Sequence, residues 1–156
     1  MKNLKFKMLI LLVPALIMSS FTLSAKQVHP LAKATDLKKI QTLIRTTNYS
    51  KVSESDFIAV RKNLCTLAKG VDISTDEGRM KAGILYMAVV NFSQFSKNPK
   101  GTRDHVTQDW QDMKASDFAK SLKNMSQEEF AESIDEKYPS DEAKAREEYK
   151  SAKSAK

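Results

Sequence analysis

The chain has 156 residues, a net charge of +7 at pH 7 and one cysteine, Cys65. Its length is sufficient for one domain with a modest hydrophobic core. A single cysteine excludes an internal disulfide framework, so the fold must be stabilised by its core or by association with another chain.

The N-terminal residues predict export. Three lysines precede an apolar stretch over residues 8–18, and small and polar residues follow as far as Ala25. This is the layout of a secretory signal peptide that is cleaved after Ala25. A membrane-spanning helix needs roughly 20 apolar residues, whereas this stretch contains Pro14 and ends at Ser19. We therefore expect residues 1–25 to be removed, which leaves a periplasmic or secreted bacterial protein without a transmembrane anchor.

Charge is distributed unevenly over the expected mature chain. Loss of the three leader lysines lowers the net charge from +7 to +4. Residues 26–103 carry 14 basic and 6 acidic side chains, and residues 104–156 carry 9 basic and 13 acidic ones. This asymmetry either steers an anionic partner to the N-terminal half or lets the two halves attract each other.

The mature N-terminus, residues 26–34, is expected to be loose. A first amphipathic helix is predicted to begin after Thr35 or Asp36, both of which can cap it, and to end near Thr46. Its apolar residues recur at spacings of three and four, which places them on one helical face.

A second helix is predicted to open at Ser53 or Ser55 and to end at Gly70. Its apolar stripe runs from Phe57 through the leucines on either side of Cys65. Because a free cysteine within such a stripe is usually buried, we expect Cys65 to be a core residue rather than a reactive thiol.

The most apolar segment of the mature chain lies in its middle. Ser74 and Glu77 match the S-x-x-E capping box, which predicts a helix over about residues 75–96. No residue from 84 to 90 is charged, and a helix that is apolar nearly all round is usually buried on most sides. We therefore predict an all-α domain of five to six helices over residues 35–139, arranged around this central helix.

Beyond a loop at residues 96–101 the predicted helices become shorter. Three helices are expected, and they begin at Thr102, Ser116 and Ser126. The last has a capping box with Glu129 and is stopped by proline. Residues 140–156 are expected to form a charged C-terminal helix or tail that frays at its end.

The sequence shows no pattern of a catalytic, metal or cofactor site, and we predict a protein that is not an enzyme. His105 is followed by Asp109 and Asp112 at helical spacing, but this group offers only one nitrogen ligand. The four glycines form no phosphate-binding loop. Basic residues do not cluster with aromatic ones in a nucleic-acid-binding motif, and export argues against a nucleic-acid partner.

These exclusions favour a protein that acts by binding another protein, in an inhibitor, immunity or chaperone-like role. The profile is similar to that of periplasmic holdase chaperones and toxin-neutralising immunity proteins, although no motif carries residues over from either. Two alternatives remain: a carrier of a small apolar ligand or lipid, and a hydrolase with a site near His105.

The predicted partner surface combines part of the central helix with the loop that follows it. Its basic loop also offers a weak possibility of contact with an anionic surface or lipid headgroups. The residues of this surface are Met80, Ile84, Met87, Phe92, Phe95, Lys97, Lys100 and Arg103.

Overall fold

The computed structural model describes residues 27–101 and 103–154, and over these residues the chain is all-helical, with no strand. The predicted all-α fold is confirmed. The predicted signal peptide, residues 1–25, lies outside the described residues. The six α-helices are α1 (Leu37–Thr46), α2 (Glu54–Lys69), α3 (Asp76–Lys97), α4 (Gln108–Ser121), α5 (Gln127–Lys137) and α6 (Glu142–Ser154). Three short 3-10 helices lie at Pro30–Ala32, Tyr49–Lys51 and Leu122–Asn124.

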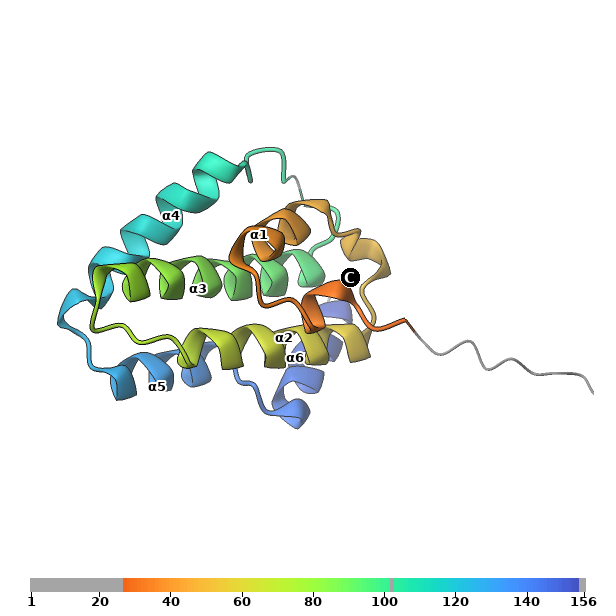
Figure 1. Ribbon diagram of the computed structural model, residues 1–156. Coiled ribbons are helices and arrows are strands. Elements are labelled where there is room, and N and C mark those ends of the chain that lie inside the picture. Colours follow the sequence, from red (N-terminus) through yellow and green to blue (C-terminus); the bar gives the residue numbers. More distant parts are fainter. Residues whose placement is uncertain (1–26, 102, 155–156) are drawn as a thin grey trace, which may run out of the picture.

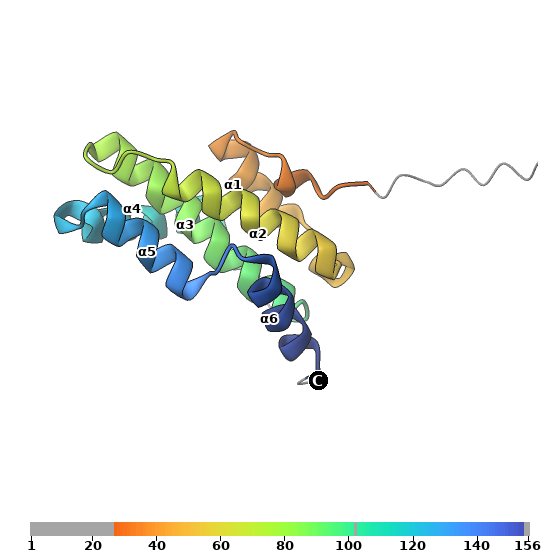
Figure 2. The same cartoon turned by 90° about the horizontal axis from the view of Figure 1, so that it is seen from below.

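The long helix α3 is packed between α2 on one side and α1 and α4 on the other (Figure 1). Its side chains Leu85, Val89 and Phe92 are buried in the common core, whereas Met80 and Ile84 remain partly exposed. Helices α5 and α6 follow one another along the side of α2, as Figure 2 shows from below. The core draws side chains from α1, α2, α3, α5 and α6, and the strip of α3 that carries Met80 and Ile84 is incompletely covered.

Capping side chains set the beginnings of most helices, as the sequence predicts. Asp36 caps α1, and Ser53 and Ser126 form capping boxes at α2 and α5. The predicted box of Ser74 and Glu77 at α3 is wrong. There Thr75 is the cap and accepts from the Gly78 N–H at 3.0 Å, while the Ser74 N–H donates to Asp72.

The region after α3 also differs from the prediction. One continuous helix, α4, replaces the two helices expected to begin at Thr102 and Ser116, and it is capped by Thr107. Ser116 lies in mid-helix and makes no cap. The side chains of Gln111 and Ala115 are buried one turn apart against the rest of the bundle, and this packing carries the helix past the serine.

The start of the described chain is packed rather than loose. Leu31 is fully buried, and the side-chain amide of Asn63 on α2 donates to the carbonyl oxygens of Leu31 and Ala34 at 2.8 and 2.9 Å. These bonds satisfy two backbone acceptors beside the core. The sequence alone predicts a loose segment here, because the residue that fixes it, Asn63, comes from another element.

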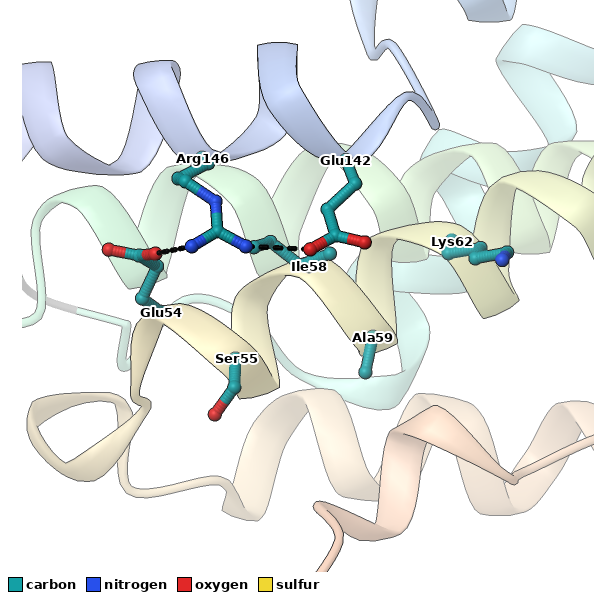
Figure 3. Close-up of a pocket in the computed structure, with 7 residues that line it drawn as sticks. All are labelled: Glu54, Ser55, Ile58, Ala59, Lys62, Glu142 and Arg146. Atoms are coloured by element: carbon teal, nitrogen blue, oxygen red, sulfur yellow. Dashed lines mark hydrogen bonds and ion pairs between the residues drawn. The ribbon is translucent and has the colours of Figure 1, made fainter.

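The C-terminal helix α6 is likewise part of the domain. Ala145 is buried, and the Tyr149 hydroxyl donates to the carbonyl oxygen of Val52 at 2.8 Å. Arg146 bridges Glu54 on α2, at 3.0 Å, and Glu142 on α6, at 2.6 Å (Figure 3). The small pocket along this α2–α6 seam is thus crossed by one ion pair, Arg146–Glu54, that joins the two helices.

Ion pairs join the basic and acidic halves of the sequence. Glu148 accepts from Arg61 at 2.5 Å and from Lys97 at 2.8 Å, and Asp135 accepts from Lys69 at 2.7 Å. All three cations belong to the basic half and both carboxylates to the acidic half. Part of the charge asymmetry between the two halves is therefore explained by ion pairs within the domain.

Candidate functional site

The partly exposed strip of α3 forms the floor of an open groove of about 730 Å³. Met80 and Ile84 supply this floor, and side chains of α1 and α4 supply the walls. We call it the α1–α3–α4 groove. Its wall residues are Leu37, Lys38, Gln41 and Thr42 from α1 and Gln108 and Asp112 from α4.

The groove exists because α4 leaves α3 at an angle. The two helices approach most closely at Gly83, where a Cβ atom would lie 2.3 Å from the carbonyl oxygen of Ala115. From this crossing α4 runs obliquely away from α3, and α1 lies in the angle between them (Figure 1). α1 covers only part of that angle, which leaves Met80 and Ile84 accessible.

A polar network fixes the two walls to each other. The side-chain amides of Gln41 and Gln108 both donate to the Oδ1 atom of Asp112, at 2.8 and 2.9 Å. The side-chain amide of Gln111 donates to the carbonyl oxygen of Gln41 at 3.4 Å. Because these buried or half-buried polar groups satisfy one another, the shape of the groove is formed before any partner binds.

Positive charge flanks the apolar floor. Lys38 lies in one wall, and a second pocket of about 340 Å³, which shares Met80 with the groove, is lined by Arg79, Lys120 and Lys123. Arg79 pairs with Asp76, which lines the same pocket, and Lys120 lies 3.3 Å from Asp117. Within the described part of the chain, Lys38 and Lys123 make no ion pair, so their charges are available to a partner.

The structure divides the aromatic and Met residues that the sequence assigned to a partner surface. Met80 and Ile84 lie in the groove, while Met87 is partly buried outside it. Phe92 and Phe95 are core residues: the Phe92 ring stacks on Phe57 at 6.0 Å, and the Phe95 ring meets Tyr49 edge-on at 5.4 Å. These two phenylalanines contribute to stability and lie outside the groove.

The predicted basic loop is also divided. Lys97 is engaged by Glu148. Arg103 donates to the carbonyl oxygen of Thr47 at 3.0 Å, and its guanidinium lies 4.7 Å from the centre of the Tyr49 ring. Lys100 is exposed. Two of the three cations are therefore engaged within the domain.

The residues considered for chemistry are not brought together. In residues 27–101 and 103–154, no group of three or more His, Cys, Asp and Glu side chains is arranged to hold a metal ion. Asp112 faces α1, whereas the His105 ring packs edge-on against Trp110 at 5.3 Å.

Cys65 is fully buried, and its thiol lies 3.4 Å from the carbonyl oxygen of Tyr138. Burial raises the pKa of this thiol to about 11, so it is protonated at neutral pH. A protonated thiol that solvent does not reach is a poor nucleophile, which fits the core role predicted for Cys65.

Sequence reasoning missed the walls of the groove. In the sequence, Leu37 and Gln41 show only helical periodicity, and Asp112 is notable only for its spacing from His105. Their common location follows from the α3–α4 crossing. The sequence feature that indicates this crossing is Gly83, a glycine inside an otherwise strong helical pattern.

Comparisons with family profiles, with curated proteins and with solved structures found no significant match to this chain. In the described part of the chain, none of the helices combines the length and the apolar character needed to cross a bilayer.

Proposed function

We propose that this chain is an exported, non-catalytic protein that binds another protein through the α1–α3–α4 groove. The observation that carries the proposal is the preformed groove itself, with Met80 and Ile84 accessible on its floor. Partly exposed apolar side chains between two helices are the usual receptor for the apolar face of an amphipathic segment. An inhibitor, an immunity protein or a chaperone would each use such a surface.

The charges around the groove define the chemistry of the partner. Lys38 and Lys123 have no ion-pair partner in the described residues, whereas Arg79 and Lys120 are paired with Asp76 and Asp117. Electrostatic complementarity then favours a segment with apolar anchors flanked by acidic side chains. Such charges mainly accelerate association, so binding is expected to weaken as ionic strength rises.

A second candidate function is the transport of a small apolar ligand or lipid. The groove volume of about 730 Å³ lies within the range of small-molecule sites, roughly 300–1,000 Å³. The open shape of the groove favours the protein partner, since small-molecule sites enclose most of their ligand. The two functions predict different material bound at the same place.

Capture from a periplasmic extract tests the proposal. We expect the exported protein to retain one protein in near-stoichiometric amount. The Ile84→Glu variant should retain at least about tenfold less, because removing water from a carboxylate on the floor of the groove is strongly unfavourable. Met113→Glu is the matched control, because Met113 is 50% exposed and lies outside the groove. The bound material is identified and quantified by mass spectrometry, and circular dichroism checks that both variants fold.

A captured protein that Ile84→Glu retains as well as the wild type does would contradict binding in the groove. Recovery of no protein would count against a protein partner altogether. Recovery of a lipid or small apolar molecule, lost with Ile84→Glu and kept with Met113→Glu, would establish the carrier function instead.

A further inference from the structure

A separate pocket of about 260 Å³ lies where the C-terminal half of α3 meets the start of α4. Asn91, Gln94, Phe95 and Asn98 follow one another at spacings of three and one, which places them on one face of α3 and its C-terminal cap. His105 and Trp110, from the far side of the connecting loop, close the pocket. We call it the Asn91 pocket.

Asn91 is unusual within this pocket. Only 2% of the residue is exposed, and its side-chain nitrogen is buried with no hydrogen-bond partner among the described residues. A buried donor left without a partner is unfavourable, because it has lost its hydrogen bond to water and gained none in exchange. Buried polar groups are satisfied in the great majority of cases, so an amide that lines a pocket and lacks a protein partner is a candidate donor to a ligand or a water molecule.

The remaining lining restricts the kind of ligand. None of the residues that line the pocket is an aspartate, glutamate, lysine or arginine, and His105 is the sole titratable one. The carboxamides of Asn91, Gln94 and Asn98 each offer both a donor and an acceptor. A neutral ligand with hydroxyl groups, which also donate and accept, matches this set better than an anion or an alkyl chain.

Aromatic rings supply the other half of the recognition. The Trp110 indole is partly exposed and is held by an edge-on contact with the His105 ring at 5.3 Å and 82°. A partly exposed indole ring can pack against the C–H face of a flat ligand. The pocket volume of about 260 Å³ suits one sugar-sized ring rather than an oligomer.

From these features we propose that the Asn91 pocket binds a neutral monosaccharide unit, with the Asn91 amide donating to a hydroxyl oxygen and Trp110 packing against the ring face. The site is distinct from the α1–α3–α4 groove, because Asn91 lies about two helical turns beyond Ile84 and the two pockets share no lining residue. The proposal therefore stands or fails independently of the protein partner.

The chain contains a single tryptophan, so Trp110 is a specific reporter. The exported protein is titrated with glucose, galactose and N-acetylglucosamine while the indole N–H resonance and the tryptophan fluorescence are recorded. We expect at least one of these sugars to shift the indole resonance saturably, with a Kd of about 1 mM. Asn91→Leu should weaken that binding at least about tenfold, and Met113→Ala should leave it unchanged.

Asn91→Leu also removes an unsatisfied buried donor, so its melting temperature in the absence of sugar should not fall. Should this variant fail to fold, Gln94→Ala replaces it, because Gln94 is exposed and its loss should weaken the same sugar severalfold. No saturable indole shift with any of the three sugars up to about 50 mM would overturn the proposal. An equal response of the wild type and a folded Asn91→Leu or Gln94→Ala would overturn it as well.

Discussion

Glu148→Ala is expected to lower the free energy of unfolding by about 3 kcal/mol, because it leaves a buried guanidinium without its counter-charge. The Arg61 side chain is 0% exposed, and its Nη2 atom lies 2.5 Å from the Glu148 carboxylate. The rings of Phe57 and Tyr138, at 5.1 and 5.3 Å, give the cation some compensation. Its Nε and Nη1 atoms have no hydrogen-bond partner among the described residues, so the carboxylate is its principal source of stabilisation there. Urea denaturation followed by circular dichroism measures the change.

Two comparisons isolate the buried charge as the cause. Glu142→Ala removes an exposed pair with Arg146, which keeps Glu54, and should cost less than about 0.5 kcal/mol. The double variant Arg61→Met with Glu148→Gln should recover much of the loss, because no uncompensated charge remains. If Glu148→Ala costs no more than Glu142→Ala, the buried ion pair does not hold α6 to the domain.

Gly83→Ala is expected to lower the free energy of unfolding by about 3 kcal/mol, because the added methyl group collides with the backbone of α4. The added Cβ would lie 2.3 Å from the carbonyl oxygen and 3.0 Å from the carbonyl carbon of Ala115. These are backbone atoms, so α4 as a whole must move to relieve the contact. Thermal and urea unfolding of the variant measure the loss.

Gly70→Ala is the matched control for this substitution. A Cβ at Gly70 meets only the carbonyl oxygens of Thr66 and Leu67, at 3.3 and 3.6 Å, and the backbone there is right-handed. Reduced freedom of the unfolded chain offsets much of the contact, so the change should remain under about 1 kcal/mol. Equal stability of the two variants would show that the α3–α4 crossing is not close-packed at Gly83.

Helical periodicity and capping side chains predicted most of the helices. The two errors share one feature, which is that a residue able to cap a helix does not always do so. Thr75 replaced Ser74 because Asp72 accepts the Ser74 N–H. Ser116 did not start a helix because burial of Ala115 continues the previous one. The local sequence indicates which residues can cap a helix, and tertiary packing determines which of them does so.

The candidate site was less predictable than the fold. Periodicity identified Met80, Ile84 and Phe92 as one apolar face, but it does not predict which part of that face the neighbouring helices cover. That depends on the angle of α4, which the close contact at Gly83 sets. The hydrogen-bond partners of Asn63 and Arg61 could not be predicted from the sequence either, because they lie 29 to 87 residues away along the chain.

The central claim is that a protein partner contacts the floor of the α1–α3–α4 groove. Photo-crosslinking in living cells from a reactive amino acid placed at position 84, with position 113 as the exposed control site, tests it. We predict one discrete crosslinked protein from position 84 and none at comparable yield from position 113. Equal crosslinking from both positions, or the absence of a crosslinked protein at position 84, would contradict the claim.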